Sequence, residues 1–193
     1  MKRLNLLLIF GLSIMLFACA NQKNTTKPTG SHLIGGSFEM ENHKGKMVTD
    51  KDFKGLYQLV FFGFTKCPTV CPVGMSTIGR TLNSLPKKMA EKVQPIFVTI
   101  DPERDTPEVM AKFIKIFNKR FVGLRGSTEQ TDDMVKKYRA YYGRIQKDGE
   151  EDYEMEHSDI IYFMGKDGEY LSHFSSAHSV EDIKTRVESL IKL

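Results

Sequence analysis

Short apolar runs alternate with segments of helical periodicity over most of the chain. Residues 56–64, "LYQLVFFGF", and 95–100, "PIFVTI", are rich in β-branched and aromatic residues and predict two buried strands. The apolar spacing between these runs predicts a helix with Pro72 in its first turn, and its expected buried residues are Met75, Ile78, Leu82 and Leu85. Two strands joined by a helix are typical of an α/β protein.

Capping residues mark two helices in the second half of the chain. Thr106 as N-cap and Pro107 at the first position predict a helix that ends near Asn118. Its expected buried residues are Val109, Met110, Phe113 and Phe117. Ser127 and Gln130 have the spacing of a capping box and predict another helix. The expected apolar positions of that helix are Met134, Val135, Tyr138 and Tyr142.

The C-terminal third predicts strands followed by a last helix. Residues 121–124 predict a short strand, and residues 159–164 and 170–174 predict two more that are joined by the turn "GKDG". A capping box of Ser179 and Asp182 then predicts a final helix, whose expected buried residues are Ile183, Val187 and Leu190.

The order of these elements indicates the fold class. Residues 37–40 and 46–48 flank a turn and predict an additional β-hairpin near the N-terminus. Strand, helix, strand and helix, followed by a hairpin and a closing helix, are the pattern of a thioredoxin-like fold. We therefore expect an α/β protein with a thioredoxin-like fold and an added N-terminal β-hairpin, in one domain over residues 35–193.

The N-terminus predicts export to the outer face of a membrane. Lys2 and Arg3 precede an apolar run at residues 4–17, which is typical of a signal peptide. A run of about fourteen residues is short for a membrane-spanning helix, which needs roughly 20. Residues 16–19, "LFAC", resemble the lipobox of bacterial lipoproteins. We expect a signal peptide over residues 1–19 with Cys19 as the lipid attachment site, and an uncleaved anchor is the alternative.

The charge and polarity of the chain limit its partners. The formal net charge is +4, and it falls to about +2 once the signal peptide is removed. Because basic runs interleaved with aromatic residues are lacking, nucleic acid is not an expected partner. Residues 20–34 are mostly polar and predict a flexible linker between the membrane and the domain. We expect a monomer, lipid-anchored on the outer face of the bacterial cytoplasmic membrane.

The stretch "FTKCPTVCPVG" places Cys67 and Cys71 directly after a predicted strand and at the start of its helix. Unpaired backbone amides and the helix dipole favour the thiolate at this position. If the two residues are one helical turn apart, their Cα atoms lie about 6 Å from each other, which a disulfide can bridge. This spacing permits a redox disulfide, a metal site or a structural disulfide.

A histidine is expected to complete the site. Thioredoxin-type oxidoreductases place a cis-proline opposite their thiols, but no proline follows Pro107, and His157 stands close to the expected position. Two thiolates and one imidazole favour copper, with zinc as the usual competitor. A fourth ligand from Met155 or Glu156 remains open. Structural or surface roles are expected for the other histidines, His32, His43, His173 and His178.

Three separated motifs resemble the signatures of one protein family. They are "FTKCPTVCP" at residues 64–72, "TIDPERDTP" at 99–107 and "EHSDIIYFMGKDGEY" at 156–170. Together they resemble the Sco (SenC/PrrC) family, over about 160 residues from Gly35 to the C-terminus. Proteins of this family have a thioredoxin-like fold, bind copper, and assist assembly of the CuA centre of cytochrome c oxidase.

The resemblance assigns roles to four residues. It implies that Cys67, Cys71 and His157 are copper ligands, for Cu(I) or Cu(II), and that Cys67 and Cys71 form a disulfide in the oxidised apo form. Asp101 matches the acidic residue that the family places near the metal, in the second shell. The implied partners are the CuA-bearing subunit of cytochrome c oxidase and an extracytoplasmic thiol reductase.

Two enzymatic alternatives remain beside the expected metallochaperone. One is a thiol-disulfide oxidoreductase that acts on exported proteins without metal transfer, which needs the dithiol but not His157. The other is a peroxidase, whose reactive cysteine commonly needs a nearby arginine; the sequence offers no candidate beside Cys67. We expect a copper-binding assembly protein rather than an enzyme.

Overall fold

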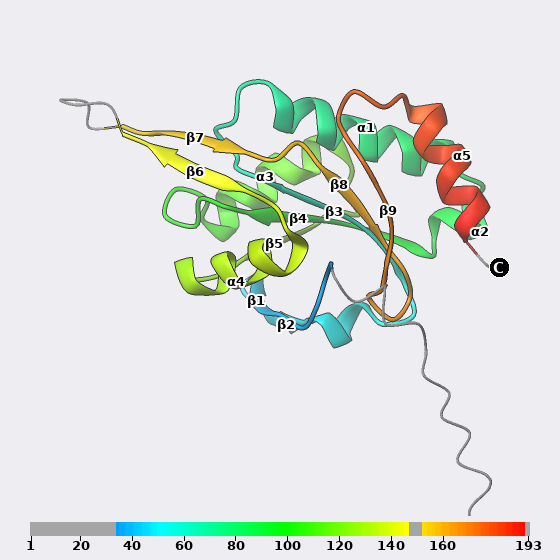
Figure 1. The fold of residues 1–193 in the computed structure, drawn as a ribbon, viewed down its shortest axis with the longest axis horizontal. Coiled ribbons are helices and arrows are strands. Elements are labelled where there is room, and N and C mark those ends of the chain that lie inside the picture. The colour runs from blue at the N-terminus through cyan, green and yellow to red at the C-terminus, as the bar shows by residue number, and fades with distance from the viewer. Residues whose placement is uncertain (1–33, 147–151, 192–193) are drawn as a thin grey trace, which may run out of the picture.

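The structure is a computed structural model that describes residues 34–146 and 152–191. Its principal sheet has seven strands in the order β2-β1-β5-β4-β3-β8-β9, and β6 and β7 form a separate two-stranded sheet (Figure 1). The strands are β1 (Glu39–Asn42), β2 (Met47–Thr49), β3 (Tyr57–Gly63), β4 (Val93–Thr99), β5 (Val122–Arg125), β6 (Tyr142–Ile145), β7 (Glu154–His157), β8 (Ile161–Met164) and β9 (Tyr170–Phe174). The helices are the 3-10 helix η1 (Asp50–Phe53), α1 (Val70–Ser84), α2 (Lys87–Ala90), α3 (Pro107–Phe117), α4 (Thr128–Tyr138) and α5 (Val180–Leu190).

The central strand β3 is buried along its whole length between helices. It pairs in parallel with β4 and antiparallel with β8. Because side chains alternate across a strand, Phe61 lies under α1, where Gly74 leaves room for its ring, and Phe62 packs against Tyr138 of α4. In Figure 1, α1, α3 and α5 lie on one side of the sheet and α4 lies on the other. The predicted strand–helix–strand unit is therefore confirmed.

The predicted capping residues begin three helices. Thr106 caps α3 by accepting a hydrogen bond from the amide of Val109 (3.3 Å), with Pro107 in the first turn. Ser127 with Gln130 forms the capping box of α4, and Ser179 with Asp182 forms that of α5. The N-terminal hairpin is also confirmed, since β1 and β2 pair antiparallel and β1 joins the sheet beside β5.

Two expectations about the helices are wrong. Val109 is 40% exposed, and Ile114 is buried in its place, because α3 turns Met110 and Ile114 toward the sheet. Tyr142 is not on α4, because that helix ends at Tyr138, where Arg139 adopts a left-handed conformation with φ 53°. Such a backbone ends a helix, and the chain then enters β6.

The β6–β7 hairpin was not predicted from the sequence pattern, and neither were the short helices η1 and α2. Its strands pair antiparallel, with Tyr142 opposite His157 and Ile145 opposite Glu154. Its signal was weak, since its strands are short, polar and largely outside the core. The turn-forming pair "DG" at residues 148–149 stands between them in the sequence and could have indicated it. His157 is consequently the last residue of β7, a strand that the sequence pattern did not predict.

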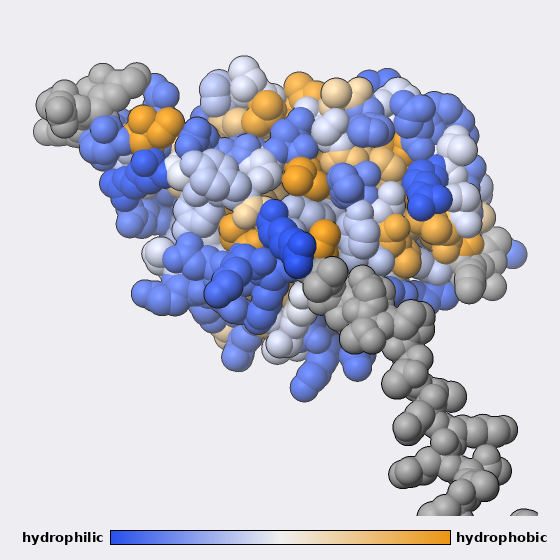
Figure 2. Space-filling model, in the orientation of Figure 1, coloured by the Kyte–Doolittle hydropathy of each residue, from blue (hydrophilic) through white to orange (hydrophobic). Residues whose placement is uncertain are grey.

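Polar residues dominate the face of the molecule shown in Figure 2, and apolar residues form small separate patches there. Among the described residues, the exposed large apolar side chains are spread over β2, α1, α3, β6 and the residue before β6, and they are Met47, Val73, Val109, Ile116, Tyr141 and Ile145. Within residues 34–146 and 152–191, no helix has the length and hydropathy needed to span a bilayer. The predicted signal peptide, Cys19 and almost all of the linker lie outside the described residues.

Candidate metal centre

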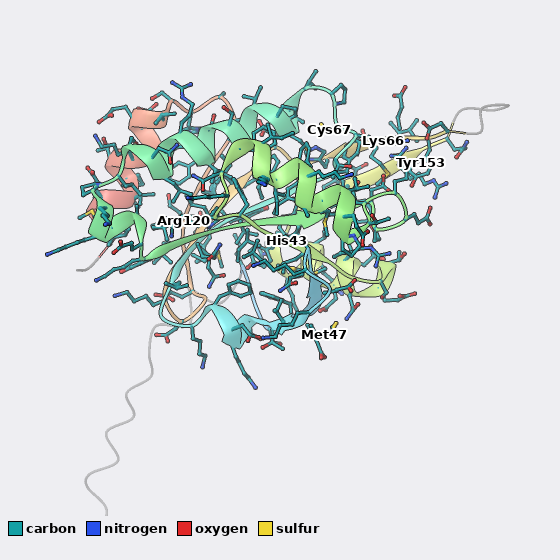
Figure 3. The ribbon with its side chains drawn as sticks, turned by 180° about the vertical axis from the view of Figure 1, so that it is seen from behind. His43, Met47, Lys66, Cys67, Arg120 and Tyr153 are labelled. Carbon is teal, nitrogen blue, oxygen red and sulfur yellow. The ribbon has the colours of Figure 1, made fainter. Side chains whose placement is uncertain are left out.

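Cys67, Cys71 and His157 meet at one end of the molecule, as expected. Their Sγ and imidazole nitrogen atoms all lie within 4.8 Å of one another. The Nε2 atom of His157 is 3.2 Å from the sulfur of Cys71 and 3.7 Å from the sulfur of Cys67. No fourth His, Cys, Asp or Glu joins the cluster within the described part of the chain. Figure 3 shows Cys67 at the same end of the molecule as Lys66 and Tyr153.

The end of β3 and the first turn of α1 position the two cysteines. Cys67 lies in the turn between these elements, where its amide donates to the carbonyl of Phe64 (3.2 Å). Cys71 is fully buried in the first turn of α1, and its amide donates to the sulfur of Cys67 (3.4 Å). Gly63, the last residue of β3, packs directly against the sulfur of Cys71, so a Cβ atom at residue 63 would overlap that sulfur. The absence of a side chain at residue 63 thus makes room for the second thiol.

His157 is oriented by contacts on both sides of its ring. Its Nδ1 lies 3.0 Å from the carbonyl oxygen of Ser158. Since a carbonyl oxygen only accepts hydrogen bonds, Nδ1 carries a proton and Nε2 is directed at the two sulfurs. The rings of Phe61 and Phe64 meet the imidazole edge to face, with centroids 6.0 and 5.8 Å away. The backbone and these rings therefore fix which nitrogen faces the thiols.

The two thiols have opposite acid–base character. The hydrogen bond from Cys71 outweighs burial and, with contacts to His157 and backbone amides, lowers the pKa of Cys67 to about 3. The pKa of Cys71 is raised, because its proton is held by Cys67 and burial disfavours a second thiolate. Burial opposes protonation of His157, but its contacts with Cys67 and Ser158 raise its pKa. The two cysteines together therefore carry one negative charge at neutral pH, on Cys67.

The low pKa of Cys67 predicts an unusual pH profile of alkylation in the reduced protein. A thiol whose folded pKa is about 3 remains a thiolate above that pH, so iodoacetamide is expected to label Cys67 at pH 5. Cys71, with its raised pKa, is expected to stay unlabelled there. Peptide mass spectrometry measures this, with the Cys67→Ser variant as control. Labelling of Cys67 that rises only near pH 8 to 9, as for an ordinary thiol, would contradict the prediction.

A cleft of about 540 Å³ opens beside the cluster. Its walls come from the cysteine loop and from β7, and they include Cys67, Val70, Met155 and His157. Arg104 also lines this cleft, so an arginine does stand near Cys67, contrary to the expectation from sequence. Its guanidinium is held by Asp101 and Asp152, which makes it a structural partner of these carboxylates.

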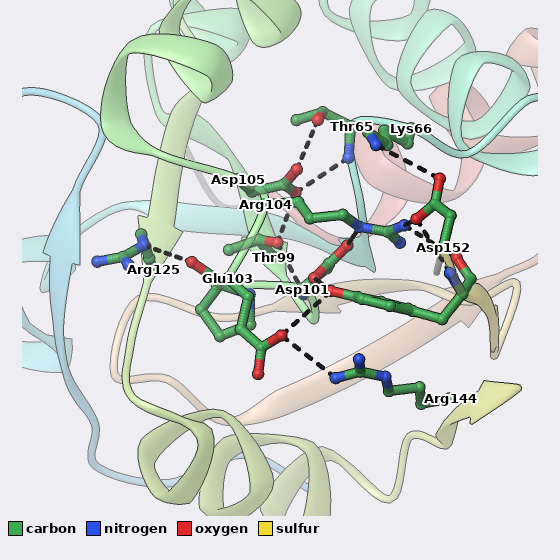
Figure 4. A network of polar contacts seen from close by, with 12 residues as sticks. Thr65, Lys66, Thr99, Asp101, Glu103, Arg104, Asp105, Arg125, Arg144 and Asp152 are labelled. Atoms are coloured by element: carbon green, nitrogen blue, oxygen red, sulfur yellow. Dashed lines mark hydrogen bonds and ion pairs between the residues drawn. The ribbon is translucent and has the colours of Figure 1, made fainter. Parts of the chain in front are cut away.

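The two aspartates of the "DPERD" segment have separate structural roles (Figure 4). Asp105 is fully buried and accepts hydrogen bonds from the amide and hydroxyl of Thr65 (3.0 and 2.5 Å) and from the hydroxyl of Thr99 (2.6 Å). It thereby ties the cysteine loop to the end of β4. Asp101 is 3% exposed and accepts hydrogen bonds from Arg104 and Tyr153.

The remaining candidates are further from the centre or engaged elsewhere. The hydrogen-bond partners of the Asp101 side chain within the described ranges are Arg104 and Tyr153, neither of which is a ligand residue, so its role near the metal stays a prediction. Glu156 is exposed and accepts from the hydroxyl of Tyr141. Met155 is partly buried and packs against the core at the wall of the cleft. His43 accepts a hydrogen bond from the amide of Gly123 (3.1 Å), which is a structural role.

Known proteins that are similar to this chain in sequence share its fold. The sequence model of the SCO1/SenC family matches residues 26–192. The human mitochondrial SCO1 homolog is 39% identical over 154 residues, which cover 79% of this chain and 51% of that protein. The chain thus spans about half the length of this curated relative. The structure of Bradyrhizobium japonicum ScoI with copper bound has 36% identity and a TM-score of 0.74, and the match covers 82% of this chain and 99% of that chain.

Two other solved structures extend the comparison. A SCO1/SenC family lipoprotein from Bacillus anthracis str. Ames is 26% identical with a TM-score of 0.67, over 82% of this chain and 95% of that chain. BsSco, in which a disulfide switch was identified, is a member of the Sco family of cytochrome c oxidase assembly proteins; it is 25% identical with a TM-score of 0.62, over 84% of this chain and 95% of that chain. These likenesses confirm the thioredoxin-like α/β fold. With three motifs, this fold and a match over most of its length, the chain belongs to the SCO1/SenC family.

Proposed function

We propose that this protein binds copper through Cys67, Cys71 and His157 and assists assembly of the CuA centre of cytochrome c oxidase. The observation that carries the proposal is the convergence of two sulfurs and one imidazole nitrogen within 4.8 Å in a member of this family. The copper-bound ScoI structure and the assembly role named for BsSco's family support it. The client is the oxidase subunit that carries CuA.

The donor set fits copper better than zinc. Two soft thiolates with one imidazole suit Cu(I) and also accommodate Cu(II). The two thiolates balance the charge of Cu(II) and exceed that of Cu(I) by one, so both oxidation states are tolerated. A structural zinc site has four protein ligands as a rule, and the described His, Cys, Asp and Glu residues supply only three here. The burial of both sulfurs protects such a site from solvent.

The same thiols need a reductant in an exported protein. Outside the cytoplasm, two neighbouring thiols oxidise readily, so a Cys67–Cys71 disulfide is the expected form of the oxidised apo protein. Both cysteines are free in this structure, and a disulfide switch is known in BsSco. An extracytoplasmic thiol reductase is therefore a required partner before metal can bind.

The membrane anchor is proposed from the sequence. Cys19 as a lipid-modified residue would hold the domain at the outer face of the bacterial cytoplasmic membrane, with residues 20–34 as the tether. The lipoprotein from Bacillus anthracis supports this arrangement.

A second function, reduction of the client's disulfide without metal transfer, is favoured by one observation. The low pKa of Cys67 and the retained proton of Cys71 are the pattern of a nucleophilic and a resolving thiol. Such a reductase requires both cysteines and does not require His157.

Complementation of oxidase assembly in a strain that lacks this protein separates the two functions. Copper delivery predicts that His157→Ala and Cys71→Ser both lose most assembled oxidase activity, because each removes a ligand. Thiol reduction predicts that Cys71→Ser alone loses it. His173→Ala is the matched control, since His173 is an exposed histidine that contacts Tyr170 far from the cysteines in sequence. Full activity of His157→Ala would overturn the copper-delivery proposal.

A further inference from the structure

We propose that Asp101, Arg104 and Tyr153 form a latch that positions the β6–β7 hairpin, and through it His157, against the two cysteines. The part that concerns copper rests on the function proposed above. The positioning of the hairpin does not rest on that function, because it follows from contacts within the protein. The proposal assigns to Arg104 and Tyr153 a role that no motif in the sequence indicated.

The acceptor at the centre of the latch is the buried carboxylate of Asp101. The hydroxyl of Tyr153 donates to Oδ1 (2.6 Å), and Nε of Arg104 donates to Oδ2. The side chain of Asp101 is only 2% exposed and that of Arg104 15%, so both charges are largely removed from water. A buried carboxylate needs such partners to offset its lost hydration. The loop after β4 thus holds the chain segment that leads into β7.

Arg104 connects this loop to the hairpin at two more points. Its Nη1 donates to the carbonyl oxygen of Tyr153 (2.9 Å) and to the carboxylate of Asp152 (2.8 Å). Its guanidinium carbon also lies 3.7 Å from the centroid of the Tyr153 ring, and that of Arg144 lies 3.5 Å from the same ring. Two guanidinium groups against one aromatic ring give cation–π attraction in addition to hydrogen bonds. Figure 4 shows Arg104 and Asp101, from the loop, near Asp152 and Arg144, from the hairpin segments.

The hairpin needs this support because it lies outside the principal sheet. Its strands pair only with each other in the described structure. Near its base, the amide of Ser158 donates to the carbonyl of Tyr141 (2.9 Å), and the amide of Tyr141 donates to the hydroxyl of Ser158 (2.7 Å). A two-stranded ribbon is marginal by itself in water. The hydroxyl of Tyr142, at the base of the hairpin, donates to Asp132 of α4, and the latch supplies a second attachment at the other end of β7.

The alternation of a strand links the latch to the metal centre. Tyr153, Met155 and His157 occupy every second position, so they share one face, and all three are partly buried. Glu154 and Glu156 alternate with them and are exposed. A change in the twist or tilt of the strand at Tyr153 therefore also changes how His157 is oriented toward the two sulfurs. Arg104 and Tyr153 are positioning residues, since they act through His157.

Hydrogen exchange of the reduced apo protein tests the latch without metal. Tyr153→Phe removes the hydroxyl bond to a buried carboxylate and keeps the ring between the guanidinium groups. Loss of a hydrogen bond to a charged group is expected to raise amide exchange in residues 142–146 and 152–157 by about ten-fold. Tyr141→Phe is the matched control, because it removes a hydroxyl at the base of the same hairpin that donates to the exposed Glu156, and less than about two-fold change is expected. Equal exchange in Tyr153→Phe and the unsubstituted protein would overturn the latch.

Copper titration of the same variants tests whether the latch acts through His157. Cu(I) affinity, measured by competition with a chromophoric chelator, is expected to fall about ten-fold in Tyr153→Phe, in the range typical for loss of an outer partner of a metal ligand. In the His157→Ala background, adding Tyr153→Phe is expected to change the Cu(I) affinity by less than about two-fold, because the imidazole that Tyr153 positions is gone. An equal loss in both backgrounds, or no loss at all, would overturn positioning of His157.

The hydrogen-exchange and copper-titration experiments test the latch and the proposed copper function separately. If the unsubstituted protein binds no copper, the proposed function fails while the exchange result still decides the latch. Arg104→Lys is the second latch variant. It keeps the charge beside Asp101 and avoids an unpaired buried carboxylate, but it cannot bond Asp101, Asp152 and the carbonyl of Tyr153 together. We expect Arg104→Lys to raise exchange in residues 142–146 and 152–157 as Tyr153→Phe does, and exchange equal to that of the unsubstituted protein in either variant would reject the latch.

Discussion

Serine in place of Cys71 is expected to lower the Cu(I) affinity of the reduced protein by more than about 100-fold. Loss of an outer hydrogen-bond partner of a metal ligand typically costs about 10- to 100-fold, and loss of a thiolate ligand is more severe. The remaining donors would be one thiolate and one imidazole. Competition with a chromophoric chelator under anaerobic conditions measures the effect.

Cys19→Ser is the matched control for that experiment. Both variants are produced without lipid attachment, so that Cys19 keeps its thiol and each substitution removes one thiol. Cys19 precedes the folded domain by a polar linker in the sequence. We expect its affinity to equal that of the unsubstituted protein. A Cys71→Ser variant that binds Cu(I) as tightly as the Cys19→Ser control would reject Cys71 as a ligand.

The second large effect is expected from Gly63→Ala, which adds one methyl group against the sulfur of Cys71. Alanine at Gly63 would place Cβ against the sulfur of Cys71, 3.2 Å from the Phe97 ring and 3.3 Å from the Phe61 ring. All of these groups are buried, so the cost is overpacking, about 1–3 kcal/mol in the free energy of unfolding. Because the sulfur of Cys71 must move, copper affinity is expected to fall as well. Urea denaturation measures the first effect and chelator competition the second.

Gly123→Ala controls for the loss of a strand glycine. Gly123 is in β5 and, like Gly63, has no left-handed backbone, and a Cβ there would have neighbours at 3.4–3.7 Å, which is ordinary contact. We expect little change in unfolding free energy and none in copper affinity. Equal behaviour of Gly63→Ala and Gly123→Ala would contradict the packing account of residue 63.

The elements predicted from the sequence are those whose signals are local. Buried runs of β-branched and aromatic residues marked β3 and β4, and capping boxes marked the starts of α4 and α5. The error at Val109 has a different origin, because the sheet beneath α3 decides which apolar stripe is buried. The extension of α4 to Tyr142 failed because a left-handed residue, Arg139, ends the helix without a glycine signal.

The site was predictable only in part. The cysteines follow a strong strand signal, and the position of His157 followed from fold order, so their meeting could be anticipated. The contacts of Arg104 and Tyr153 could not, because they depend on a polar hairpin whose place is set by those same contacts. The role of Asp105 was likewise hidden, since its partners Thr65 and Thr99 come from two different strand ends.

X-ray absorption at the copper edge tests the central claim most directly. The claim is that this protein holds one copper ion between two thiolates and one imidazole. For the reduced full-length protein loaded with one equivalent of Cu(I), the account predicts two sulfur neighbours and one nitrogen neighbour, with the nitrogen lost in His157→Ala. A copper environment without sulfur, or one that His157→Ala leaves unchanged, would contradict it.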